Sequence, residues 1–447
     1  MLAILPLILA LLGGAPSDPQ KPRPPALDKA LRARIAELAA RWWAARPRTR
    51  FEDWNALDRA ALEREARALG ALPEGTSAEV IELVWQAAKK SWKKVPLEKN
   101  KLVLQTPYGE AWAWLTGSGK NEPLIVGLHG GGEGAGSADE PRGTWTRKGA
   151  LGVYPQGIQL VHDTWNTVHG ERFVLSLIEI AKLQFDADPD RVYVAGFSMG
   201  GTGSWFFAGR HPDLFAGAAP CAGVFMASPR SQLAKKEEVL AIQHGLVPNV
   251  RDLAMWYFIG EEDDHCMPGT YLFAADLLAR LRGEDPGGWA NVHFKTYPGL
   301  RHEYPKGEPA GALNFLFEQK RVHAPETLVW EYARSQSPEP DANDKVTRID
   351  THAFYWLRCQ EPQDRQWIRA VRAKNEIQLT CRDTASGAKG LTVCLDATMI
   401  DPASEVVVKL GDKELYRGKP APDVWTILEC MDERAERSMV FDRRIEL

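Results

Sequence analysis

The sequence lacks a strong excess of either charge, and it lacks paired cysteines of the metal-binding type. Its 447 residues carry a formal net charge of -4, whereas a nucleic-acid binder needs a basic face that neutralises phosphates. We therefore expect no nucleic-acid partner. None of the six cysteines belongs to a C-x-x-C pair, which argues against zinc and thioredoxin-type sites. We also expect no metal and no organic cofactor.

A hydrophobic run long enough to cross a bilayer, about 20 residues, is also missing. The apolar segment Leu2–Leu12 is shorter and is followed by the small residues Gly13, Gly14 and Ala15. This pattern is typical of a signal peptide, so we expect residues 1–16 to be one and the protein to be secreted or periplasmic. The alternatives are an uncleaved anchor and a mis-assigned start, because no Lys or Arg precedes the run.

The first part of the sequence after this segment has a helical pattern. Apolar positions recur at helical spacing in three stretches between residues 27 and 94. We predict a helical N-terminal module over residues 17–100 that packs against the rest of the chain or dimerises. Ser77 is the expected N-cap of the third helix. The length of the chain calls for further domains, since single cores rarely grow beyond about 250–300 residues.

Two further regions differ in their patterns. From residue 101 to residue 323, short apolar strands alternate with helical segments, which predicts a mostly parallel sheet covered by helices on both faces. After residue 323 come short β runs separated by turn residues. We therefore expect residues 324–447 to form an all-β, sandwich-like accessory domain.

The sequence Gly196-Phe197-Ser198-Met199-Gly200 matches the nucleophile motif G-x-S-x-G. In such a motif the serine occupies a strained turn between a strand and a helix, and small residues on either side let the chain pass closely. The context fits, because RVYVAG precedes the motif as a strand and a helical segment follows it. A glycine-rich turn with a surface serine is the alternative.

The segment DPDRVYVAGFSMGGTGSW, together with the later HPDLFAGAAPCAG, resembles exported α/β-hydrolases of the polyhydroxybutyrate-depolymerase-like group. That group includes feruloyl and acetylxylan esterases, and prolyl-oligopeptidase-like and dienelactone-hydrolase-like chains are similar. The resemblance covers residues 101–321 and implies the α/β-hydrolase fold. The β region after it resembles a domain appended to such esterases.

The resemblance implies a Ser-His-Asp triad in the chain order serine, acid, histidine. Ser198 is the expected nucleophile. Asp263 stands at the Gly-x-x-Asp spacing after the strand MWYFIG and is the expected acid, with its neighbour Asp264 as the rival. His302 follows the strand NVHFKTYPG and is the expected general base. His265 is too close to the acid in sequence to be its easy partner, and its alternative roles are to shape the pocket or to donate a supporting hydrogen bond.

The oxyanion hole is expected from two backbone N–H groups. His129-Gly130-Gly131-Gly132 follows the strand PLIVGL and matches the esterase form of the oxyanion loop. We expect the N–H groups of Gly131 and Met199 to bind the oxyanion, and the side chain of His129 to brace the loop.

These residues predict a serine esterase that acts through an acyl-enzyme on small-molecule or polymer esters with short or aromatic acyl groups. The alternatives are a prolyl-oligopeptidase-like peptidase and a non-catalytic carbohydrate- or partner-binding protein on a hydrolase scaffold. Trp145 and Trp165 either stack on a substrate ring or pack in the core. Cys221 and Cys266 form either a disulfide or two buried thiols. Nothing in the sequence indicates the oligomeric state.

Overall fold

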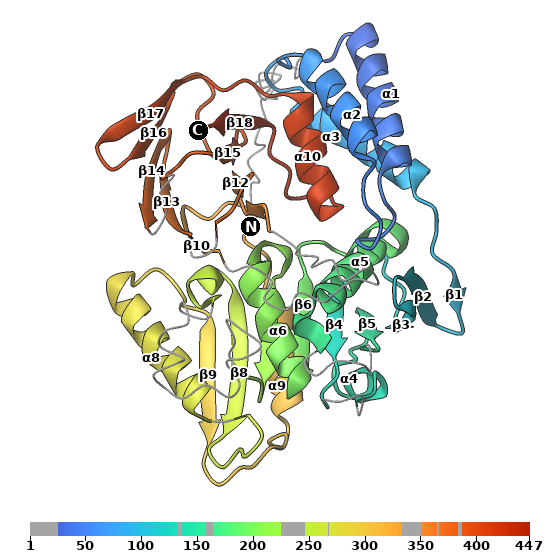
Figure 1. The fold of residues 1–447 in the computed structure, drawn as a ribbon, viewed down its shortest axis with the longest axis vertical. Helices are drawn as coiled ribbons and strands as arrows, with labels where there is room; N and C mark the ends of the chain where they lie inside the picture. The colour runs from blue at the N-terminus through green and yellow to red at the C-terminus, as the bar shows by residue number, and fades with distance from the viewer. Residues whose placement is uncertain are drawn as a thin grey trace, which may run out of the picture.

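The computed structural model is built around a nine-stranded sheet (Figure 1). The structure describes residues 26–131, 136–157, 164–224, 246–266, 268–332, 351–363, 366–382 and 387–447. The strands of the sheet, in chain order, are β1 Leu97–Glu98, β2 Lys101–Thr106, β3 Gly109–Thr116, β4 Leu124–Leu128, β5 Leu151–Pro155, β6 Val192–Phe197, β7 Gly217–Cys221, β8 Ala254–Gly260 and β9 Val292–Tyr297. Their order across the sheet is β1-β2-β3-β5-β4-β6-β7-β8-β9.

The strands from β5 to β9 run parallel, whereas β1, β2 and β3 form an antiparallel edge. The central strand β4 is buried along its whole length, which explains its uninterrupted apolar sequence. The order reverses at β4, because the chain goes first to β5 on one side and then to β6 on the other. Parallel sheets bind ligands outside the carboxyl ends of strands at such a reversal.

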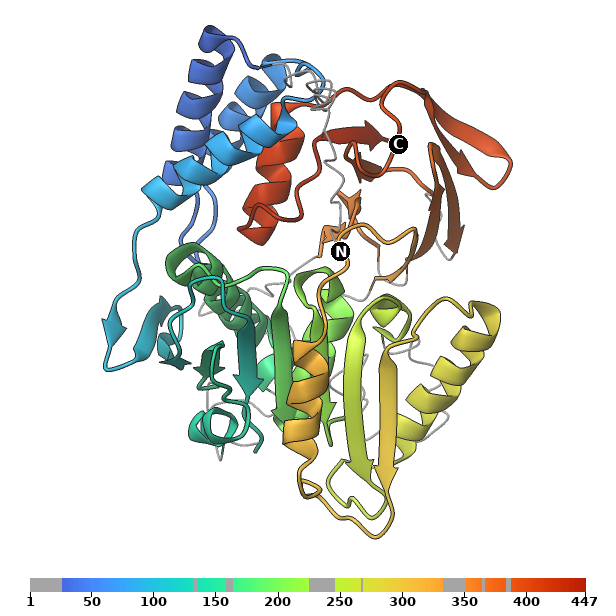
Figure 2. The same cartoon turned by 180° about the vertical axis from the view of Figure 1, so that it is seen from behind.

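Helices cover both faces of this sheet. Apolar residues of α5 Val168–Phe185, α6 Met199–Arg210 and α8 Pro268–Glu284 share a core with one face. Those of α9 Glu308–Phe317, with residues at and beside α4 Asp139–Thr144, share a core with the other. Figure 1 shows α6 in front of the strands, and Figure 2, which views the molecule from behind, shows α9 in front of them. The predicted α/β sheet with two helical layers is therefore confirmed.

The N-terminal region forms the three expected helices, α1 Lys29–Ala45, α2 Ala56–Ala68 and α3 Ser77–Ser91. The side chain of Asp28 accepts from two backbone N–H groups at the start of α1, as an N-cap does. The expected cap of α3 is wrong by one position. Thr76 precedes that helix without a side-chain cap bond, and Ser77 is already its first residue.

The C-terminal region contains two further sheets. The first consists of β10 Thr327–Glu331, β13 Trp367–Ala373, β14 Glu376–Arg382, β16 Val406–Leu410 and β17 Lys413–Gly418. The second consists of β11 Ala353–Phe354, β12 Leu357–Cys359, β15 Leu391–Leu395 and β18 Arg443–Glu446. The region is not all β, because α10 Val424–Arg434 forms a helix capped by the side chain of Asp423.

The N-terminal helices and the C-terminal sheets share one hydrophobic core. Ile35, Trp42 and Val84 from the helices belong to the same cluster as Trp425 and Leu428 from α10. Figures 1 and 2 both show α10 beside the N-terminal helices. The first and last parts of the chain therefore pack as a single layer above the sheet, and domain boundaries near residues 100 and 324 stay predictions. Among the described residues, no helix is long and apolar enough to span a membrane.

Candidate active site

Ser198 lies at the turn between β6 and α6, in a backbone conformation that residues other than glycine rarely adopt. Its φ is 58° and its ψ is -123°, and such strain persists only where the surrounding structure enforces it. A Cβ atom on Gly196 would overlap the backbone of Gly200, and one on Gly200 would overlap the carbonyl of Leu128. Both glycines of the motif are therefore required by close backbone contacts.

The three predicted triad residues lie together, although they come from loops far apart in sequence. His302 Nε2 is 2.8 Å from Ser198 Oγ, and His302 Nδ1 is 2.8 Å from Asp263 Oδ2. These loops follow β6, β8 and β9, whose carboxyl ends meet at one edge of the parallel sheet. The geometry places one imidazole between a hydroxyl and a carboxylate, as a general base requires.

Asp263 is held in its ionised form by hydrogen bonds. Its side chain is fully buried, and burial alone raises the pKa of a carboxyl group. The bonds from His302 and from the backbone N–H groups of Cys266 and His265 outweigh burial and lower the pKa of Asp263 below its ordinary value. The carboxylate therefore keeps its charge, which orients the imidazole and stabilises the imidazolium.

The rival acid Asp264 points elsewhere. Its carboxylate is exposed and binds Nδ1 of His265 at 2.8 Å. That bond is the main cause of the lowered pKa of Asp264. The structure therefore brings Asp263, and not Asp264, to His302.

The loop after β4 passes directly beside the serine. A Cβ atom on Gly130 would lie 3.3 Å from Cβ of Ser198. Nε2 of His129 accepts from the backbone N–H of Gly157, so its Nδ1 carries the proton and donates to the carbonyl of Gly130. Burial lowers the pKa of His129 and favours this neutral form.

This bond also orients the N–H group predicted for the oxyanion hole. In a planar trans peptide the N–H points opposite to the C=O, so fixing the carbonyl of Gly130 fixes the N–H of Gly131. Gly131 has a φ of +79°, which favours glycine. Met199 is the first residue of α6, where a backbone N–H has no partner within the helix. Gly132 lies outside the described residues.

The structure decides between the alternatives that the sequence left open for two pairs of residues. Trp145 and Trp165 are 0% and 1% exposed, so neither can stack on a substrate ring. Instead, Nε1 of Trp165 donates to the carbonyl of His129 and supports the oxyanion loop. Cys221 and Cys266 are both buried, and no disulfide joins them.

Three further residues lie at the site beside the triad and the oxyanion loop. The ring of Tyr304 packs on Phe197, with centroids 4.3 Å apart, and its hydroxyl donates to Glu140. His265 stacks on His302. Tyr304 and His265 stand within two residues of predicted triad members, and Glu140 belongs to the polar, glycine-rich stretch after the oxyanion loop, which is a candidate for the site entrance.

One group near the serine has the composition of a metal site. Ligand atoms of Asp263, His265 and His302 lie within 4.8 Å of one another. Asp263 and His302 are already hydrogen-bonded to each other and His302 also to Ser198. A bound cation would have to replace the proton between them, so we assign no metal to this group.

The strand order and the strained serine turn define an α/β-hydrolase fold. In this fold the serine occupies a sharp strand-to-helix turn at the top of the sheet, and the acid and the histidine follow it in that order along the chain. Here Ser198 stands between β6 and α6, and the loops of Asp263 and His302 come after β8 and β9.

Comparison with known proteins agrees with this class. Residues 108–282 match the family model described as putative esterase, which confirms the resemblance for that segment. Poly(3-hydroxyalkanoate) depolymerase C of Paucimonas lemoignei is 35% identical over 123 residues, or 24% of this chain and 29% of that relative. The chain thus spans less than a third of the length of this curated relative.

Solved structures of hydrolases also align with part of the chain. A thermostable esterase is 22% identical with a TM-score of 0.35, over 49% of this chain and 62% of its own. Acetyl xylan esterase from Aspergillus awamori is 16% identical with a TM-score of 0.37, over 48% and 99%. An acylaminoacyl peptidase is 18% identical with a TM-score of 0.37, over 52% and 43%.

Proposed function

We propose that the protein is a serine hydrolase that cleaves carboxylic esters through an acyl-enzyme. The observation that carries this proposal is the unbroken hydrogen-bonded series from Ser198 Oγ through the ring of His302 to Asp263. A serine hydroxyl is a weak nucleophile unless an adjacent base takes its proton. Here the base, and the carboxylate that orients it, stand at hydrogen-bond distance.

In the acylation half, Ser198 Oγ attacks the ester carbonyl while His302 Nε2 takes the hydroxyl proton. The negative charge that forms on the carbonyl oxygen is bound by the N–H groups of Gly131 and Met199. The tetrahedral intermediate then collapses, the bond to the alcohol breaks, and His302 returns the proton to the leaving alkoxide.

In the deacylation half, a water molecule takes the place of the alcohol. His302 accepts a proton from the water as its oxygen attacks the acyl carbon. The second intermediate breaks its bond to Ser198 Oγ, which regains the proton from His302. The products are a carboxylic acid and the free enzyme, so all atoms and protons balance without a cofactor.

The substrate class we propose is an ester with a short or aromatic acyl group, free or displayed on a polyester or polysaccharide. Support comes from the match of residues 108–282 to putative esterases and from the local identity to a poly(3-hydroxyalkanoate) depolymerase. The two buried tryptophans no longer support a sugar-stacking site.

The deciding experiment combines active-site labelling with a substrate panel. We expect a fluorophosphonate probe to label the wild type and not Ser198→Ala, and this variant to lose at least about 10⁴-fold in ester turnover. Acetyl and feruloyl esters should be turned over faster than a palmitoyl ester or a prolyl peptide. Labelling of the variant would remove Ser198 from its role, and preference for the peptide would favour the peptidase alternative.

Export remains part of the proposal. Residues 1–25 lie outside the described part of the chain, so the support is the apolar segment with its small residues alone. Expression of the full chain in a bacterial host should yield a periplasmic or secreted product whose N-terminus lies near residue 16. A product that keeps its first residues and stays in the cytoplasm would contradict export.

A further inference from the structure

Two consecutive aspartates on the loop after β8 each bind a histidine. The inner pair is Asp263 with His302, whose side chains are 0% and 13% exposed. The outer pair is Asp264 with His265, whose side chains are 57% and 68% exposed. The proposed mechanism uses only the inner pair, and the outer pair has no role in it.

The two histidine rings stack face to face. The ring centroids of His265 and His302 are 4.7 Å apart, with 20° between the planes. Phe197 is also in ring contact with His302, with centroids 4.8 Å apart and a tilt of 40°. The imidazole of the general base therefore has two aromatic neighbours, of which His265 is the more nearly parallel.

We propose that His265, anchored by Asp264, is a positioning residue that holds the ring of His302 in the plane needed to reach Ser198 and Asp263 together. This inference rests on the proposed function, because it concerns the general base of that reaction.

The reason is geometric. Both nitrogens of His302 must keep their 2.8 Å contacts during proton transfer, and displacement of about 1 Å of a reacting group can cost about 10²-fold in rate. His302 is carried by a loop, so the packing around its ring must limit rotation. The flat ring of His265, stacked on one face of the His302 ring, limits this rotation on the side where His302 faces solvent.

Two bonds keep His265 itself in place. Its Nδ1 is 2.8 Å from the carboxylate of Asp264, which fixes the ring of a side chain that is otherwise exposed. Its backbone N–H donates to Oδ1 of Asp263 at 2.9 Å. One residue therefore contacts both the acid and the base of the inner pair, through its backbone and its ring respectively.

The test compares three variants of the full-length protein with a p-nitrophenyl acetate assay. His265→Ala removes the ring, and we expect kcat to fall about tenfold while KM stays within twofold. His265→Phe keeps a flat ring without the imidazole, and we expect kcat within about threefold of the wild type. Asp264→Asn keeps a hydrogen-bond acceptor for His265 and should lie between the two.

A matched control is His323→Ala. His323 is a partly exposed histidine that is also bound to an aspartate, with Nε2 at 2.7 Å from Asp190, but it has no part in the proposed machinery. We expect its kcat to equal that of the wild type. A comparable loss in this control would show that the loss in His265→Ala reflects a general effect on folding, and the positioning role would be overturned.

The outcomes separate this inference from the proposed function. If the wild type neither hydrolyses the ester nor reacts with a fluorophosphonate, the proposed function fails. If the wild type is active and His265→Ala matches it in kcat and labelling rate, the positioning role is overturned while the proposed function stands. If His265→Phe is as slow as His265→Ala, stacking is not what His265 supplies, and the inference is also overturned.

Discussion

The carboxyl-terminal end of the sheet, which carries Ser198, and the charged cleft between the sheet and the N-terminal helices differ in how their polar groups are used. The cleft has a volume of about 640 Å³ and is lined by residues of the N-terminal region, α5, α10 and the second C-terminal sheet. It lies between the N-terminal helices and the sheet, whereas β8 and β9 run away from those helices toward the loops of the triad (Figures 1 and 2).

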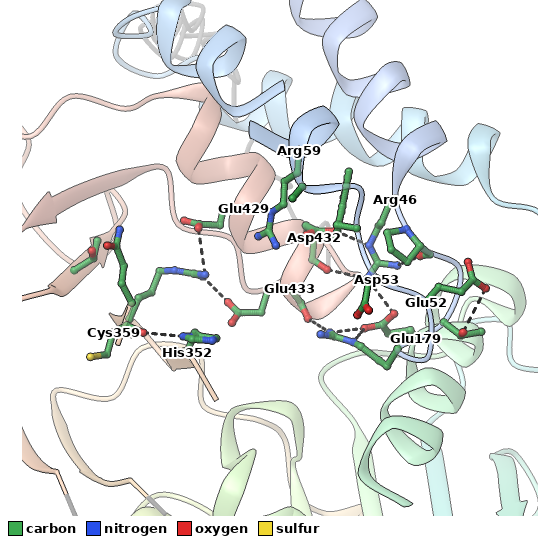
Figure 3. A pocket seen from close by; sticks show the side chains of 18 of the residues that line it. Arg46, Glu52, Asp53, Arg59, Glu179, His352, Cys359, Glu429, Asp432 and Glu433 are labelled. Atoms are coloured by element: carbon green, nitrogen blue, oxygen red, sulfur yellow. Dashed lines mark hydrogen bonds and ion pairs between the residues drawn. The ribbon is translucent and has the colours of Figure 1, made fainter. Parts of the chain in front are cut away.

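In the cleft the buried charges neutralise one another. Arg46 pairs with Glu179 at 3.0 Å and with Asp432 at 2.5 Å, and Arg358 pairs with Glu433 at 2.5 Å. In Figure 3, dashed lines join Arg46, Glu179, Asp432 and Glu433 to neighbouring side chains that line the cleft. Glu179 keeps its charge because Arg46 and Arg50 outweigh burial and lower its pKa.

At the carboxyl-terminal end of the sheet, in contrast, Ser198, His302 and Asp263 form one linear series of hydrogen bonds, and the nucleophile lies on strained backbone. A cleft lined by many charged residues is therefore not by itself a catalytic site, because charges that are paired with one another have few hydrogen bonds left to offer a ligand. What distinguishes the triad is a hydroxyl beside a base whose other nitrogen is held by a fully buried carboxylate.

The largest effect on activity is expected when Asp263→Asn is compared with Asp264→Asn. The asparagine amide cannot hold His302 in the correct tautomer, so we expect kcat to fall about 10⁴-fold. Asp264→Asn should lose less than about tenfold, because its carboxylate binds His265 and not His302. Steady-state kinetics with p-nitrophenyl acetate checks both, and a larger loss at Asp264 would reverse the assignment of the acid.

On the cleft side, Glu179→Gln should act on stability and not on chemistry. Glu179 is 5% exposed and pairs with both Arg46 and Arg50, and removing one partner of a buried pair costs about 3–5 kcal/mol. Urea unfolding measures this loss, and kcat of the folded variant should equal the wild-type value. The control Glu82→Gln breaks an exposed pair with Arg437 and should cost less than about 1 kcal/mol. Equal losses in the two variants would contradict the contrast.

The stability difference between wild type and Glu179→Gln should depend on pH. The folded-state pKa of Glu179 lies below its unfolded value, so its contribution is complete above the unfolded pKa, about 4.3, and is lost as pH falls through the folded pKa. Urea titrations at pH 7, 5 and 4 should give a constant difference between pH 7 and pH 5 that begins to shrink at pH 4. A difference that grows on acidification would show that the carboxyl is protonated in the folded state.

The smallest effects are expected at two cleft residues outside the ion-pair networks. Asp53 is exposed, and the guanidinium of Arg59 lies 5.8 Å from the ring centroid of Trp54. We expect Asp53→Asn and Arg59→Gln to change the free energy of unfolding by no more than about 0.5 kcal/mol. A loss above about 2 kcal/mol in either would mean that these residues join the networks.

The sequence predicted the catalytic half well because its signals are local. A β-strand, a glycine-flanked serine and a helix follow one another within residues 191–210, so one short segment carries the geometry. Strand β5 was not recognised, because LGVYP is short and follows a polar glycine-rich stretch. The roles of Ser198, Asp263 and His302 stay predictions, although the structure brings the three together.

The rest could not be read from the sequence because it depends on contacts between distant residues. The stacking of His265 on His302 needs the exact approach of two loops, which no spacing encodes. Helix α10 had a local signal, the N-cap Asp423 before apolar positions at helical spacing, yet the surrounding strands hid it. Burial of Trp145 and Trp165 depends on packing that residue type alone does not fix.

The shared core of the first and last parts of the chain has a consequence for biosynthesis. Arg46 and Asp432, which are bonded across this layer, are 386 residues apart. At a synthesis rate of about 5–20 residues per second, Asp432 follows Arg46 by roughly 20–80 s. The ring of Trp42, which packs against Trp425 of α10, lacks that partner during this time, although α2 and α3 can already pack on α1. The layer formed by the first and last parts of the chain is therefore completed only after the sheet between them has been made.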